Sequence, residues 1–265
     1  MLKLVKVTAV YIKKGASLYH KQIKFVPLQQ NYGLYTIYRM KELIQYRATI
    51  FVDSAIGYTK DNVARFPLKE WKCMPLNNGA NSQTINPFEI ISSSKEFDGA
   101  EWKAVNLEKG LVVVFLGQKI DILGQPFIDG HSFVQISKQI FDQVCAGYNV
   151  KKIVRFAYSP TYGEKNGDFS EILRHPSYKD SEAENVAVRS VYRVDEDIND
   201  KKIKINYLIE ISSGVFVDKE KQMPSVIYDV DINSTVVEGL TFDISDMDAF
   251  FDKADIFAND FIQQF

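Results

Sequence analysis

Two adjoining stretches of alternating side chains constrain the fold most. Residues 186–194 and residues 202–212 each alternate apolar with polar residues, which is the pattern of a strand that buries one face. The polar segment of residues 195–201 joins them and has the composition of a hairpin turn. We therefore expect two paired antiparallel strands in the second half of the chain.

Shorter apolar runs predict more strands than helices. The other segments expected to be strands are residues 2–7, 34–38, 48–52, 88–92, 111–116 and 150–158. Residues 162–168 have the composition of a loop. Residues 57–84 are rich in Gly, Asn, Pro and charge, and their length suggests an excursion or a lid.

Three segments have helical features. Residues 40–46 predict a brief helix. In a second segment, Ser132 and Gln135 form a capping box, apolar residues recur at helical spacing up to Val144, and Gly147 closes the helix. A C-terminal helix is expected over residues 245–265, with a stripe of phenylalanines. These elements predict an α+β fold with mixed, largely antiparallel sheets and three or four helices. No change of composition marks a linker, so we expect residues 1–265 to form a single domain.

Composition places the chain among ordinary globular proteins. Of the 265 residues, 46% are hydrophobic and 25% are charged, and the net charge is −2. This balance does not favour long-range attraction to nucleic acid or to anionic lipid, although a local basic patch remains compatible with it. Lys3 and Lys6 interrupt the apolar N-terminus, so no signal peptide is expected, and the apolar run at residues 111–116 is too short to cross a bilayer. We expect a cytoplasmic protein without a membrane partner.

The cysteines and histidines do not suggest a metal site. Cys145 lies on the apolar side of a predicted helix, so a buried free thiol is expected there. The three histidines are scattered, and none forms a pair with a cysteine at zinc-ligand spacing. We expect no bound metal.

The segment from Tyr178 to Glu184 is the strongest indication of chemistry. Glu182 and Glu184 stand two positions apart, just before the alternating strand of residues 186–194. Residues i and i+2 of a strand point to the same face, with Cα atoms roughly 7 Å apart. Both carboxylates are therefore expected to address one ligand.

Two segments earlier in the sequence join the acidic pair in a recognisable order. Arg39 follows a predicted strand, and the serines Ser92, Ser93 and Ser94 end another. An arginine, a serine-ended strand and an E-x-E, in this order, resemble the R-S-E pattern of mono-ADP-ribosyltransferases. The resemblance implies an enzyme that cleaves NAD at the nicotinamide–ribose bond and transfers ADP-ribose to a macromolecule.

That resemblance also assigns roles. Arg39, beside Tyr38, would hold a phosphate of NAD through charge-assisted hydrogen bonds. The serines would support the strand around the nicotinamide pocket. Glu184 would bind the ribose hydroxyl and stabilise an oxocarbenium-like centre, while Glu182 would position the acceptor. Tyr178, in the turn before the acidic pair, would help to select the target, which is a protein or a nucleic acid.

A second resemblance covers roughly residues 34–240. The chain carries Tyr38-Arg39, a serine-ended strand at residues 91–94, Trp102, a glycine-led apolar strand and the late E-x-E followed by Arg189. This order is similar to an uncharacterised bacterial domain with an opening YR motif, which often occurs among phage-defence and toxin-like genes. It implies a toxin or antiviral effector, with a neutralising antitoxin as a possible partner.

Two other classes stay open. The acidic loop could be the contact surface of a non-enzymatic recognition module in a defence or regulatory system. A divalent-metal nuclease could use Asp and Glu ligands, for which Asp229 and Asp231 are candidates, although such triplets are common at strand ends. The acidic run at residues 195–200 fits a hairpin turn better than a calcium loop, because Asp200 stands where the turn glycine belongs.

Overall fold

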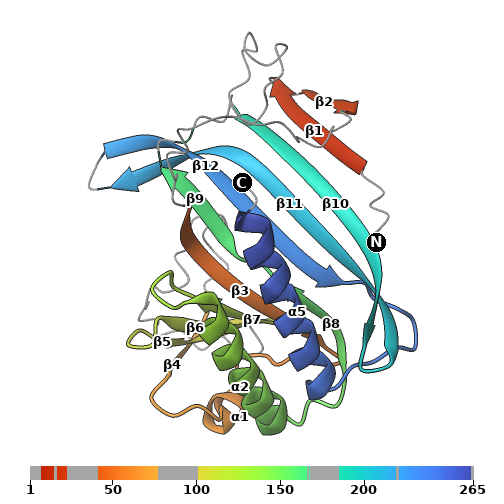
Figure 1. Ribbon diagram of the computed structural model, residues 1–265. Coiled ribbons are helices and arrows are strands. Elements are labelled where there is room, and N and C mark those ends of the chain that lie inside the picture. The colour runs from red at the N-terminus through yellow and green to blue at the C-terminus, as the bar shows by residue number, and fades with distance from the viewer. Residues whose placement is uncertain are drawn as a thin grey trace. The chain divides into compact units, whose positions relative to one another are not determined.

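A computed structural model describes residues 7–14, 17–22, 41–76, 101–165, 167, 185–218 and 221–263 (Figure 1). The chain divides into two compact units. Unit 1 comprises Met1–Ile44, Pro160–Val194 and Asn206–Asp231, and unit 2 comprises Gln45–Ser159, Asp195–Ile205 and Ile232–Phe265. The strand pairings with an assigned register are all antiparallel. The predicted α+β class is confirmed.

Unit 1 is built on antiparallel strands. It contains β1 (Val7–Lys14), β2 (Ser17–Gln22) and β9 (Thr161–Lys165), together with parts of the long strands β10 (Asn185–Ile198), β11 (Lys201–Asp218) and β12 (Lys221–Ser234). The order is β2–β1–β10–β11–β12, and β9 pairs with β12. The expected hairpin is present, since β10 and β11 are joined by a turn at Asn199 and Asp200, both with positive φ.

Unit 2 combines strands with helices. Its elements are β3 (Glu42–Val52, from Gln45 onward), β4 (Lys72–Pro75), β5 (Trp102–Asn106), β6 (Leu111–Leu116), β7 (Lys119–Gly124), β8 (Ile153–Tyr158), α1 (Lys60–Arg65), α2 (Gly130–Tyr148) and α5 (Ile244–Gln263). The end of β12 pairs with β8, and the order continues β8–β3–β7–β6–β5–β4. The expected C-terminal helix is confirmed as α5.

The topology of unit 2 repeats itself. The central strands β3 and β8 lie side by side and antiparallel. β7 returns to pair with β3 and leads into α2, and the end of β12 returns to pair with β8 and leads into α5. The two helices pack together, with the rings of Phe141 and Phe251 stacked at 5.8 Å. The regular part of the β3–β8 ladder runs from Arg47 opposite Ser159 to Phe51 opposite Arg155, so its middle pair is Thr49 opposite Ala157.

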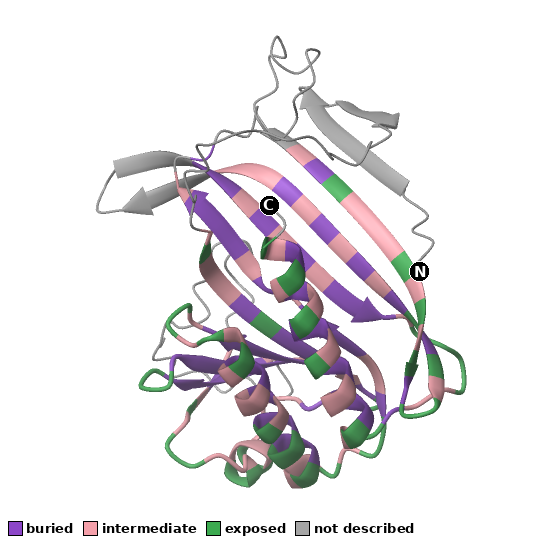
Figure 2. Ribbon diagram, in the orientation of Figure 1, coloured by how far each residue is buried: buried purple, intermediate pink, exposed green. Residues whose placement is uncertain are grey.

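Aromatic side chains fill the space between the unit 2 strands and the two helices. Along β3, Tyr46, Ala48, Ile50 and Val52 are buried on this side. The ring of Tyr46 stacks on Phe133 of α2 at 4.9 Å, and the ring of Phe156 stacks on Phe250 of α5 at 5.3 Å. Figure 2 shows the resulting division of both helices into buried and exposed sides.

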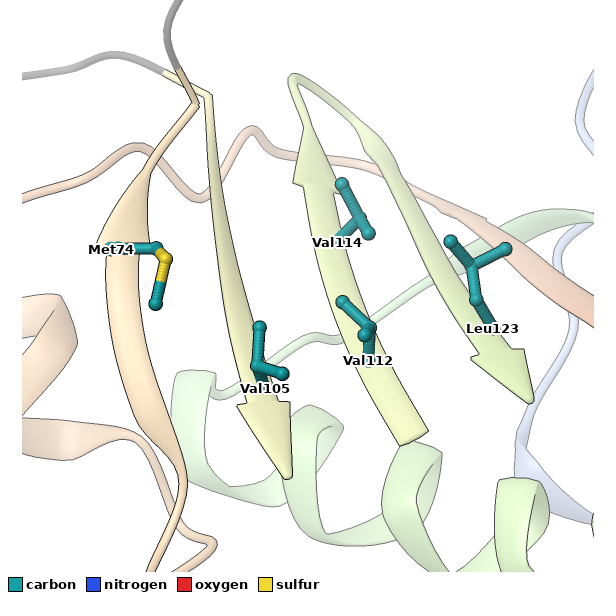
Figure 3. Close-up of a cluster of buried hydrophobic side chains, with 5 residues drawn as sticks. All are labelled: Met74, Val105, Val112, Val114 and Leu123. Atoms are coloured by element: carbon teal, nitrogen blue, oxygen red, sulfur yellow. The ribbon is translucent and has the colours of Figure 1, made fainter. Parts of the chain in front are cut away.

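The strands β4 to β7 are buried on their other face as well. Met74, Val105, Val112, Val114 and Leu123 form an apolar cluster there (Figure 3). The sequence of β6, LVVVFL, has no polar alternation, which is typical of a strand buried on both sides. The prediction of a core strand at residues 111–116 is confirmed.

Two local predictions are wrong. Residues 42–46 belong to β3 rather than to a helix, because β3 also pairs with β9, and its pairing with β7 begins at Tyr46. Residues 162–165, predicted to begin a loop over residues 162–168, belong to β9 (Thr161–Lys165), which pairs with β12. In both cases the partner strands are distant in sequence, so the local pattern of residues cannot reveal the pairing.

The boundaries of α2 also differ from the prediction. Its N-cap is Asp129, whose carboxylate accepts a hydrogen bond from the backbone N–H of Ser132 at 2.9 Å, so Ser132 is not the N-cap. The helix ends at Asn149, which has a left-handed φ of 55°, two residues beyond Gly147. Cys145 of this helix is buried and free, as expected.

Candidate functional site

The residues predicted to form the site lie outside the part of the chain that the structure describes. These residues are Tyr38, Arg39, Ser92, Ser93, Ser94, Tyr178, Glu182 and Glu184. The strand expected after the acidic pair is present: β10 begins at Asn185, the residue directly after Glu184. The acidic pair therefore precedes a strand of an antiparallel sheet, as the sequence predicted.

The first half of β10 is paired along its length. Asn185 lies opposite Lys13 of β1, and Arg189 lies opposite Ala9. The Nε of Arg189 is 3.9 Å from a carboxylate oxygen of Glu210, and both side chains are about two-fifths exposed, 43% and 38% respectively. A pair at this distance and exposure contributes at most about 1 kcal/mol to stability. Arg189 therefore keeps most of its capacity to bind an anion.

Unit 1 contains a buried polar cluster that the sequence did not indicate. Glu164 of β9 is 6% exposed, and its carboxylate accepts a hydrogen bond of 3.0 Å from the hydroxyl of Tyr228, on β12. The ammonium of Lys41 lies 5.2 Å from the centre of the Tyr228 ring. Burial lowers the pKa of Lys41, and the negative charge of Glu164 opposes that shift.

This Glu164–Tyr228–Lys41 cluster fixes the entrance to β3. Lys41 immediately precedes Glu42, whose carboxylate pairs with Lys165 at 2.8 Å, so an ion pair ties this entrance to β9. Arg39 stands two positions before Lys41 in the sequence. The hydrogen-bonded carboxylate of Glu164 and phenol of Tyr228 are deeply buried, and this burial fits a positioning role better than proton transfer to a substrate.

A second buried carboxylate lies in unit 2. Asp255 of α5 is 6% exposed and accepts a hydrogen bond of 3.1 Å from the hydroxyl of Tyr158. It faces Gly130, the first residue of α2, where an added Cβ would lie 3.1 Å from its carboxylate. Burial raises the pKa of Asp255, while the hydrogen bond from Tyr158 and the nearby His131 oppose the shift.

A surface hollow of about 310 Å³ lies where α2 ends and α5 begins. Its lining includes Cys145, Lys151, Lys152, Phe242 and Asp243. Burial, with the charge of Asp142 as a lesser cause, raises the pKa of the Cys145 thiol to about 12, so it is not a thiolate nucleophile near neutral pH. Among the described residues, no group of three or more His, Cys, Asp or Glu side chains is arranged to hold a metal ion.

Comparison with known proteins gives the chain no family. No family model, no curated protein and no solved structure matches it. Within the described ranges, no helix combines the length and the apolar character needed to span a bilayer.

The buried clusters could not have been found from sequence. Glu164 falls in a segment with the composition of a loop, and its partner Tyr228 is 64 positions away. Asp255 lies among several aspartates of α5, and only its contact with Tyr158, 97 positions away, distinguishes it. A single sequence carries no signal for such pairs.

Proposed function

We propose that this chain is an ADP-ribosyltransferase-like enzyme that transfers ADP-ribose from NAD to a protein or nucleic acid. The observation that carries the proposal is the start of β10 directly after Glu182 and Glu184. The proposal extends the strand conformation of β10 back through Glu182, so that both carboxylates lie on one face and bind the same sugar.

The proposed role of each residue follows from the charge and the hydrogen-bonding groups of its side chain. Glu184 stabilises the oxocarbenium-like ribose and Glu182 positions the acceptor, while Tyr178 selects it. Arg39 and Tyr38 hold the phosphates of NAD, and the serines at positions 92–94 support the nicotinamide pocket. NAD is a substrate in this scheme, and no metal takes part.

The Glu164–Tyr228–Lys41 cluster supports this arrangement. It anchors the segment that enters β3, two residues after Arg39. A guanidinium that binds phosphate must be held in place before the ligand arrives, since misplacement by about 1 Å lowers rates by roughly 100-fold. We assign Glu164 and Tyr228 as positioning residues.

The biological setting belongs to the proposal too. An enzyme of this kind acts in the bacterial cytoplasm as a toxin or an anti-phage effector, and a neutralising antitoxin would be its partner. The second resemblance, with its opening Tyr38-Arg39 and late E-x-E, supports this setting.

The test incubates the purified protein with NAD labelled in the adenylate part, in cell extract and with separate protein and nucleic acid fractions. We expect label transfer and nicotinamide release, both reduced about 100- to 1,000-fold by Glu184→Gln, which keeps the size of the side chain and removes its charge. Glu210→Gln is the matched control, because Glu210 is an exposed glutamate of unit 1 in a weak ion pair.

Two results would reject the proposal. One is the absence of label transfer and nicotinamide release with every acceptor fraction. The other is nucleic acid cleavage that a chelator abolishes, which would favour the metal-dependent nuclease instead.

A further inference from the structure

The strands of unit 2 have a second face, opposite the one that contacts α2 and α5. At its centre, Lys119, Phe51 and Arg155 form one row across β7, β3 and β8. The neighbouring row contains Asp121, Thr49, Ala157 and Asn233. We call the surface formed by these seven residues the second face.

Arg155 is the unusual member of this face. One terminal nitrogen of its guanidinium donates a hydrogen bond of 2.9 Å to the side-chain oxygen of Asn233, and the guanidinium carbon lies 5.1 Å from the centre of the Phe51 ring. Its Nε is buried and has no hydrogen-bond partner among the residues that the structure describes. In the part of the chain that the structure describes, no carboxylate lies within ion-pair distance of Arg155.

The nearest acid of the second face does not compensate this charge. One carboxylate oxygen of Asp121 accepts a hydrogen bond from Thr49 at 2.6 Å, and the other contacts Lys119 at 2.7 Å. Both oxygens are therefore committed to other donors. Partly buried cations in proteins are normally paired, because desolvation without a counter-charge is costly.

Other partly buried lysines of unit 2 follow that rule. Lys138 pairs with Asp252 at 2.5 Å, and Lys253 pairs with Glu196 at 2.5 Å. Arg155 thus stands out as a cation whose internal contacts are an amide oxygen and an aromatic ring, both of which leave its full charge uncompensated.

We propose that Arg155 is the anion-binding residue of a ligand site on the second face, which takes a phosphate or carboxylate group. Asn233 holds one terminal nitrogen and the Phe51 ring supports the guanidinium plane, so the fork is oriented before a ligand arrives. The remaining N–H groups of the two terminal nitrogens receive the ligand's oxygens as a bidentate pair, while the buried Nε–H lies behind them. This inference does not depend on the proposed ADP-ribosyltransferase activity.

The strand register supplies a matched control. Arg47 lies two residues before Thr49 on β3, as Arg155 lies two residues before Ala157 on β8, and Arg47 is on the same face of the sheet. Arg47 is opposite Ser159 instead of an aromatic residue, and its side chain is exposed. Arg47 is therefore open to bulk water, and within the described ranges no side-chain hydrogen bond or ion pair orients its guanidinium.

The experiment follows the arginine Nε–H resonances of the full chain by NMR during titration with sodium pyrophosphate and, separately, with sodium succinate. Arg155→Lys assigns the Arg155 signal and keeps the positive charge. We expect a saturable shift of that signal with a Kd of about 1 mM or tighter for one of the two anions. Whichever anion saturates identifies the site as one for phosphate or for carboxylate ligands.

Titration calorimetry with the same anions measures the binding affinity of each variant. Arg155→Lys loses the planar fork, so we expect affinity at least about tenfold weaker, while Arg47→Lys leaves it unchanged. If neither anion gives a saturable shift in the unmodified protein, Arg155 has a purely structural contact with Phe51 and the proposal is wrong. Equal weakening by the two variants would also overturn it, since it would show non-specific attraction.

Discussion

The contact between Lys201 and Asp246 gives the sharpest test of how unit 2 is held together. Asp246, in the first turn of α5, is fully buried, and the ammonium of Lys201 contacts one of its carboxylate oxygens. The same oxygen accepts a hydrogen bond of 2.9 Å from the backbone N–H of Asp243, and in the described part of the chain the other oxygen has no partner. The charge of Asp246 therefore depends on two donors.

Replacing Lys201 by Met removes the stronger donor and leaves the carboxylate buried. Breaking a buried ion pair by removing one partner costs about 3–5 kcal/mol. The Lys201 side chain is 31% exposed and the Asp243 N–H remains, so we expect a smaller loss, about 2–3 kcal/mol in the free energy of unfolding.

Lys204→Met is the control on the same strand. Lys204 lies 3.6 Å from Asp195, and both side chains are largely exposed, so the expected cost is below about 1 kcal/mol. Urea unfolding should show a lower midpoint for Lys201→Met with an unchanged slope. Adding Asp246→Asn should restore much of the loss, because it removes the uncompensated charge.

The reasoning is refuted if Lys201→Met costs no more than Lys204→Met. It is also refuted if Asp246→Asn adds to the loss of the Lys201 variant instead of reversing it. Either result would mean that water reaches Asp246 and that its burial is not maintained in solution.

Two further substitutions test the buried polar groups of unit 2. Burial raises the pKa of Asp255 above its unfolded value, so the folded protein loses stability as pH rises from the unfolded pKa through the folded one. Asp255→Asn removes this loss, so thermal melts across that pH range should show the melting temperature of the wild type falling relative to that of the variant. If the two melting temperatures change in parallel with pH, the burial of a charged Asp255 is contradicted. Trp102→Phe removes the indole N–H that donates to the carbonyl of Ile56 at 2.9 Å and leaves that carbonyl unsatisfied. We expect a loss of about 1–3 kcal/mol by urea unfolding, and no loss would show that the carbonyl finds another donor.

Sequence alone determined the elements whose apolar side chains recur at the period of a strand or a helix. The unbroken apolar run of β6, the alternation of β10 and β11 and the phenylalanine stripe of α5 each place apolar side chains at the period of the element that forms. These elements were enough to predict the α+β class. The strand directly after Glu184 was predicted as well, and it is the part of the candidate site's surroundings that the structure describes.

Tertiary structure decided what depends on distant partners. Residues 42–46 have enough helical character to suggest a helix, yet they become strand because β9 and β7 pair with β3. The repeated topology of unit 2 has no visible counterpart in the sequence, since strand pairing about Thr49 and Ala157 sets it. Arg155 and Asn233 are 78 positions apart, and only the folded sheet shows which groups surround this arginine. Apolar periodicity is a short-range property, whereas the environment of a charge is fixed by every segment that packs against it.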